Sequence, residues 1–72
     1  MDKVEFLEKL QDVLERDEEI TEDMILEDMD EWDSLAAMAL MAFFNKTLSI
    51  TSLPAEVRKM KTVSDIINKA GI

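Results

Sequence analysis

The centre of the chain decides its fold, and residues 33–44 read DSLAAMALMAFF. Asp33 and Ser34 open this segment, and the ten residues that follow have no polar side chain. Asp and Ser are favoured helix N-caps, because their oxygens accept hydrogen bonds from the unpaired N–H groups of the first turn. We therefore expect a helix over residues 34–46 with an exposed hydroxyl at its start. The simplest role of that hydroxyl is to cap the helix.

The segment before this helix predicts one helix and a long loop. Apolar residues recur every three or four positions over residues 2–16, which is typical of a helix that buries one face. The apolar side chains are Phe6, Leu7, Leu10, Val13 and Leu14. Residues 17–32 read as a loop with a short turn begun by Thr21, and loops of this length are often functional. We expect five of its side chains to hold it to the core: Ile20, Met24, Ile25, Leu26 and Met29.

The last third of the chain predicts two further helices. Pro54 suits the first turn of a short helix that reaches Lys59. Thr62, with Asp65 three residues later, is a capping-box variant that begins a final helix, and Gly71 suits its end. Leu48 and Ile50 read as apolar anchors in the connecting loop.

These elements predict an all-α fold, a small four-helix bundle with three longer helices and one short one. The only candidate strand, residues 48–52, lacks a partner. The chain of 72 residues reads as one domain (1–72), close to the lower limit for a self-supporting core. Without Cys or His, disulfides and zinc sites of the usual kind are excluded, so packing must supply the stability.

The composition disfavours an enzyme and a nucleic-acid-binding protein. The usual general bases and thiol nucleophiles are missing, and no His or Lys is placed by sequence to activate Ser34. Residues 1–33 hold fifteen acids and three bases, and residues 34–72 hold two acids and five bases. Phosphate binding needs clustered basic residues, so this balance instead favours partner proteins with basic docking patches.

We expect a cytoplasmic protein without a membrane segment. We also expect a monomer, and the apolar second helix leaves weak self-association open. The amino terminus lacks a basic stretch followed by an apolar one, as a signal peptide would have. The apolar run after Ser34 is about half the ~20 residues that a membrane span needs.

The acidic residues Asp28, Asp30 and Asp33 raise the possibility of a calcium loop. Counted from Asp28, the required Gly falls on Asp33 and the required Glu falls on Ala39, so the EF-hand motif fails. We expect a solvated acidic face and no metal site, and a small divalent-ion buffer is the least favoured function.

The order of these features resembles the acyl carrier protein family over nearly the whole chain. The resemblance rests on an amphipathic first helix, a long acidic loop and the motif Asp33-Ser34-Leu35. It continues through Leu48, Ile50, Pro54-x-Glu56 and Met60-x-Thr62-Val63-x-Asp65-Ile66-Ile67.

The resemblance implies a function for each residue of the Asp-Ser-Leu motif. Ser34 would carry 4′-phosphopantetheine, whose thiol holds acyl or aminoacyl groups as thioesters. Asp33 would dock the phosphopantetheinyl transferase, and Leu35 would belong to the cofactor-binding motif. From the residues themselves, we also expect Asp33 to cap the helix and Leu35 to anchor it to the core. The implied partners are that transferase, acyl- or aminoacyl-activating ligases, and condensing or acyltransferase enzymes.

The chain departs from the family in its charges, which suggests a specialised carrier outside bulk fatty-acid synthesis. Ala36 and Ala39 stand where fatty-acid carriers bear acids. Basic residues also stand where acids are commoner, at Arg58, Lys59 and Lys61.

Ten apolar residues exceed what one buried stripe requires, so part of the second helix should be an exposed partner-binding patch. We expect this patch to contain Ala36, Ala39 and either Met41 or Phe43. Trp32 is expected to pack on the core, and the packing of four side chains sets the size of any cavity: Met38, Met41, Phe43 and Met60. The alternative function is an acidic helical protein-interaction module without a prosthetic group.

Overall fold

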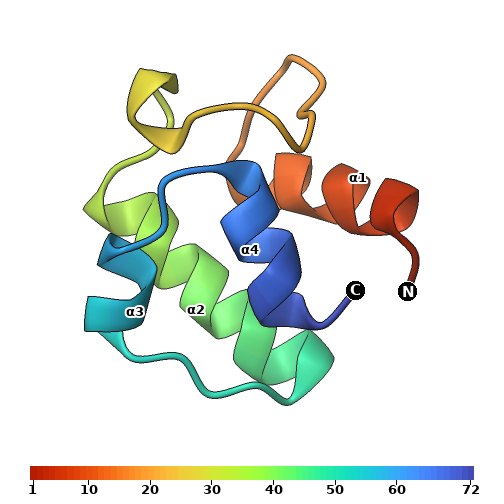
Figure 1. Cartoon of the computed structure of the whole chain (residues 1–72), viewed down its shortest axis with the longest axis vertical. Helices are drawn as coiled ribbons and strands as arrows, with labels where there is room; N and C mark the ends of the chain where they lie inside the picture. Colours follow the sequence, from red (N-terminus) through yellow and green to blue (C-terminus); the bar gives the residue numbers. More distant parts are fainter.

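A computed structural model describes all 72 residues, and the chain folds into four α-helices without a β-strand. The helices are α1 (Lys3–Val13), α2 (Ser34–Leu48), α3 (Pro54–Arg58) and α4 (Val63–Ala70). One short 3-10 helix, η1 (Leu26–Asp28), lies in the long loop between α1 and α2. The predicted small four-helix bundle is confirmed (Figure 1). None of its helices combines the length and the apolar character that a bilayer span requires.

The core forms around one face of α2, which packs against α1 and α3. The buried residues of α2 are Ala36, Leu40 and Phe44, spaced four residues apart, as one face of a helix requires. The ring of Phe44 stacks on that of Phe6 from α1, with ring centroids 6.4 Å apart. α4 adds three further buried side chains to the same core, those of Val63, Ile66 and Ile67.

The long loop before α2 is held in place by backbone pairing with the segment between α3 and α4. The N–H of Leu26 donates to the carbonyl of Lys61 at 2.8 Å, and the N–H of Val63 donates to the carbonyl of Met24 at 3.0 Å. The resulting bridge pairs Ile25 with Thr62. Ile25 is consequently exposed, and its prediction as a core anchor is wrong.

The other predicted anchors of the loop are confirmed. Ile20, Leu26 and Met29 are buried, and Met24 is half-buried against the core. The predicted turn at Thr21 also forms, because the N–H of Met24 donates to the carbonyl of Thr21 at 3.3 Å.

A part-buried ion pair joins the end of α1 to the residues that lead into α2. The side chain of Arg16 is only 13% exposed, and its Nη1 lies 2.7 Å from Oε1 of Glu31. A backbone hydrogen bond and the Arg16 guanidinium hold the pKa of Glu31 below its usual value. Because breaking such a pair leaves a charge with little access to water, this contact fixes the position of the loop next to Trp32.

The ends of α1 and α2 differ from the prediction for a local reason. α1 stops at Val13 rather than at residue 16, because Glu15 adopts a left-handed conformation with φ 54°. α2 continues to Leu48 rather than to residue 46, and ends where Ser49 turns left-handed with φ 56°. The N–H of Ile50 then donates back to the carbonyl of Phe44 at 3.0 Å, which satisfies an end-of-helix carbonyl.

This ending also corrects the reading of the segment after α2. Leu48 is the last residue of α2 and not a loop anchor, whereas Ile50 is half-buried in the loop as predicted. α3 begins at Pro54 as predicted but ends at Arg58, one residue before Lys59.

The predicted capping box of α4 is present. Oδ2 of Asp65 accepts hydrogen bonds from the N–H groups of Lys61 (2.8 Å) and Thr62 (3.1 Å), and the hydroxyl of Thr62 accepts from the N–H of Asp65. These backbone bonds to its carboxylate lower the pKa of Asp65 below 3.8. Gly71 ends the helix with φ 77°, as predicted.

The Asp65 cap predicts a pH-dependent contribution to stability. A carboxylate whose pKa is lower in the folded state stabilises the fold above its unfolded pKa, and this contribution is lost as pH falls through the folded pKa. The difference in free energy of unfolding between the parent and Asp65→Asn should therefore be constant near neutral pH and shrink below about pH 3.8. Urea denaturation at several pH values measures it. A difference that grows towards acid pH would contradict the prediction.

Candidate functional site

At the start of α2, one residue caps the helix and the next presents an exposed hydroxyl. Oδ1 of Asp33 accepts a hydrogen bond from the N–H of Ala36 at 2.8 Å, so Asp33 is the N-cap. Ser34 is the first residue of the helix, is exposed, and makes no hydrogen bond through its hydroxyl within the chain. The simplest role considered for Ser34, capping α2, is therefore wrong. Its oxygen is available to another molecule.

The structure corrects two expectations about the face of α2 that meets the core. Leu35 was expected to anchor the helix, yet it is 76% exposed. Ala36 was expected in the exposed patch, yet it is only 7% exposed. Both follow from the helical period, since burial of Leu40 and Phe44 places Ala36 inward and turns Leu35 outward.

The other predicted patch residues divide between two environments. Ala39 is exposed, as expected. Met41 is half-buried, and so is Phe43, whose ring centroid lies 5.9 Å from that of Phe6. The expectation that one of these two belongs to the exposed patch is therefore wrong. The exposed apolar surface of α2, which we call the α2 strip, consists of Leu35, Met38, Ala39 and Ala42.

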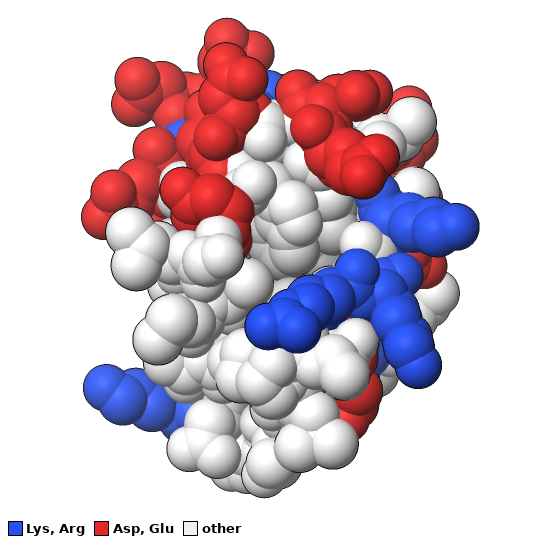
Figure 2. Space-filling model, turned by 90° about the vertical axis from the view of Figure 1, so that its left-hand side faces the viewer, with Lys and Arg blue, Asp and Glu red and all other residues white.

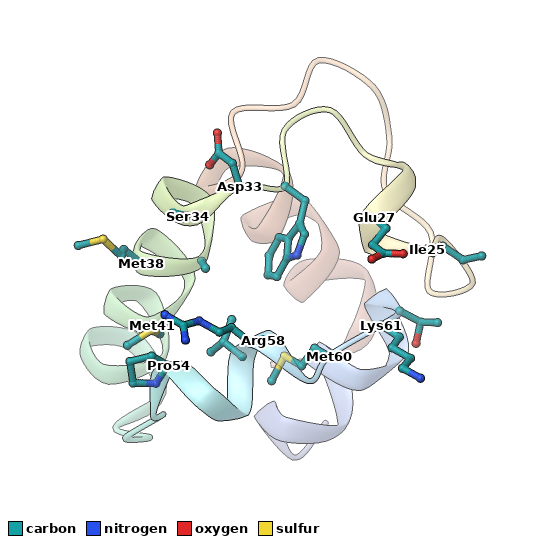
Figure 3. Close-up of a pocket in the computed structure, with 14 residues that line it drawn as sticks. Ile25, Glu27, Asp33, Ser34, Met38, Met41, Pro54, Arg58, Met60 and Lys61 are labelled. Carbon is teal, nitrogen blue, oxygen red and sulfur yellow. The ribbon is translucent and has the colours of Figure 1, made fainter.

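A groove with a volume of about 1150 Å³ opens between α2 and α3, and Ser34 lies on its rim (Figure 3). Its walls come from α2, from α3, from the segment between α3 and α4, and from the loop before α2. The apolar residues that line it are Ile25, Trp32, Ala37, Met38, Met41, Val57 and Met60. The groove is therefore an open, mostly apolar surface directly beside an unpaired alcohol.

Three of the four side chains expected to shape a cavity do line the groove. They are Met38, Met41 and Met60. Phe43 does not, because it packs on the rings of Phe6 and Phe44 instead. Trp32 packs against the core as expected and also forms part of the groove wall.

The groove contains two acidic and two basic side chains. Glu27 and Asp33 come from the loop before α2, Arg58 from α3 and Lys61 from the segment after α3. Glu27 lies on the same side of the groove as Lys61, across from Asp33 and Ser34 (Figure 3). Over the surface, acidic side chains gather at one end of the molecule and basic ones cross its middle (Figure 2). Uncharged surface lies between the two groups in the centre of this view, whereas they adjoin at its right edge. No three acidic side chains converge where they would hold a metal ion.

Several groove residues were not identified from the sequence as parts of a site. Ile25 and Pro54 were expected to be a loop anchor and a helix start, and Val57 was not singled out; their sequence pattern gives no other signal. Arg58 and Lys61 were noted only as unusual charges. Their position beside Met60 depends on where α3 ends, which the sequence does not reveal.

Comparisons with known proteins found no match to this chain among family models, curated proteins or solved structures. The site is accordingly defined by its own geometry. That geometry brings Asp33, Ser34 and Met41 to one groove and leaves Leu35 and Ala39 on the outer surface.

The orientation of α2 can be tested with two identical substitutions. Leu40 is fully buried and Leu35 is 76% exposed. Leu40→Ala should lower the free energy of unfolding by about 2–5 kcal/mol, since it removes packed methyl groups and leaves a cavity. Leu35→Ala should change it by no more than about 0.5 kcal/mol. Urea denaturation measures both, and equal losses would show that α2 buries a different face.

Proposed function

We propose that this chain is a carrier protein that holds acyl or aminoacyl groups as thioesters on a 4′-phosphopantetheine arm attached to Ser34. The observation that carries the proposal is the exposed and unpaired Ser34 hydroxyl at the rim of an apolar groove. The resemblance of the motif and of the closing pattern to acyl carrier proteins supports the same function. We expect this carrier to act in a specialised biosynthetic pathway. Its location in the cytoplasm stays a prediction.

The surroundings of Ser34 suit such an arm. The first-turn N–H groups of α2 point towards the start of the helix, where the helix dipole favours a phosphate. Asp33 already satisfies the N–H of Ala36, so modification of Ser34 costs the helix no cap. The arm supplies a terminal thiol for thioester chemistry, which a chain without Cys does not have.

The groove offers shelter to a carried group. Methionine side chains adapt their shape, so a lining of Met38, Met41 and Met60 accepts apolar chains of different forms. Trp32 closes one wall, and the ion pair between Arg16 and Glu31 fixes the segment next to it. A cargo in the groove is partly shielded from water until a partner enzyme takes it.

The α2 strip is the surface proposed to meet partner enzymes. Residues 34–55 contain no acid, so partners that read acidic side chains after the serine find none here. Leu35 and Met38 instead present apolar contacts beside Ser34. The proposed partners are a phosphopantetheinyl transferase, an activating ligase, and condensing or acyltransferase enzymes with an apolar docking surface.

Mass spectrometry tests the carrier function directly. Incubation with coenzyme A, Mg²⁺ and a promiscuous phosphopantetheinyl transferase should add the mass of one phosphopantetheine. Ser34→Ala should abolish the gain, whereas Thr47→Ala should keep it, because Thr47 is an exposed hydroxyl at the far end of the same helix. The proposal fails if the parent chain gains no mass or if the gain survives Ser34→Ala.

The dual role of Asp33 is tested by Asp33→Asn. Asn caps helices about as well as Asp, so the free energy of unfolding should change by no more than about 0.5 kcal/mol. The lost charge should lower kcat/KM of the transferase about tenfold, the size of one charged hydrogen bond. Unchanged kcat/KM would limit Asp33 to capping.

The rival function is an acidic interaction module that binds partners through the α2 strip without an arm. The exposure of Leu35 and Met38 is the observation that favours it. Partner binding that is equal in the unmodified chain, in the modified chain and in Ser34→Ala would support this rival.

A further inference from the structure

Two basic side chains of the groove have no partner within the chain. Arg58 and Lys61 line the groove and form no ion pair, although the chain contains seventeen acids. Lys3, Arg16 and Lys69, by contrast, each have a carboxylate partner. Arg58 is therefore an unpaired positive charge in the groove of a negatively charged molecule.

The other charged groups of the groove determine where an anion would sit. Asp33 lies at the start of α2 beside Ser34, whereas Glu27 lies across the groove, on the same side as Lys61 (Figure 3). The backbone bond between Leu26 and Lys61 holds Glu27 on that side, where its charge offsets that of Lys61. Arg58 extends from α3 towards the α2 side of the groove. An anion in the groove is therefore favoured beside the guanidinium of Arg58, away from both acids.

The surface between these charged groups is apolar. The half-buried side chains of Met41 and Met60 lie in the groove together with Arg58. An apolar chain gains free energy by covering them, roughly in proportion to the area that it removes from water. Apolar contact beside an unpaired guanidinium suits a ligand with an apolar body and an anionic end.

We propose that the carried group ends in a carboxylate, and that Arg58 is the residue that selects it. Attachment to Ser34 rests on the proposed function, whereas recognition of the carboxylate rests on the groove alone. The planar guanidinium matches a carboxylate with two parallel hydrogen bonds, which gives geometric selectivity that a point charge lacks. An uncharged chain of the same length leaves Arg58 without this contact.

The test uses the unmodified chain and two free probes. They are eight-carbon thioesters of N-acetylcysteamine, one ending in a methyl group and the other in a carboxylate. Trp32 is the only tryptophan and lines the groove, so its fluorescence reports binding. Shifts of the methionine methyl resonances in NMR spectra give a second measure of binding.

The quantity to compare is the dissociation constant of the methyl-ended probe divided by that of the carboxylate-ended probe. At low salt this ratio should be at least one in the parent chain. Arg58→Gln should lower it about two- to fivefold, as expected for an exposed charge pair. Lys59→Gln removes the same charge next to Arg58 but outside the groove, and should change the ratio by less than about 1.5-fold.

Three results overturn the proposal. They are a ratio that Arg58→Gln leaves unchanged, a ratio that Lys59→Gln lowers equally, and no binding of either probe by both measurements. An unchanged ratio is also the outcome if Arg58 serves only the phosphate of the arm, since the probes carry none. Failure of phosphopantetheine transfer to Ser34 would overturn the carrier function and not this measurement, because the probes bind the unmodified chain.

Discussion

The structure depends on which face of α2 is buried. The helix is apolar nearly all round, so its composition alone does not choose a face. The stacking of Phe44 on Phe6 and the full burial of Leu40 make that choice. Once it is made, the 3.6-residue period places Ser34 at the surface, Met41 beside the groove and Leu35 outward. Accessibility of the hydroxyl is thus a consequence of core packing far along the same helix.

The different roles of Asp33, which caps α2, and Ser34, whose hydroxyl is unpaired, follow from the geometry of the helix start. The cap is made by the residue before the helix, so the first helical residue needs no internal hydrogen bond. A serine that capped the helix would hold its oxygen against backbone N–H groups and would be a poor acceptor of a prosthetic group. Asp33 therefore both begins α2 and leaves the neighbouring alcohol free.

Features fixed by local chemistry were predictable from the sequence, and features fixed by contacts between distant segments were not. The capping box of Thr62 and Asp65, the proline start of α3 and the glycine end of α4 each depend on a few adjacent residues. α2 ends where Ser49 adopts a left-handed conformation. Glycine is the residue that usually marks such an end, so a serine there does not predict it. The exposed face of α2 was misassigned because an all-apolar helix has no polar side to mark it.

The uneven distribution of charge along the chain would orient a partner that approaches the site. Fifteen of the seventeen acids precede Ser34, so a partner with a basic surface is drawn to that end of the molecule. Long-range attraction of this kind speeds encounter and sets orientation more than it sets affinity. The α2 strip, which has no acids, then supplies apolar contact at short range. In the proposed carrier function, a partner guided in this way would arrive with its active site beside Ser34, and Arg58 would stay free to face the carried group.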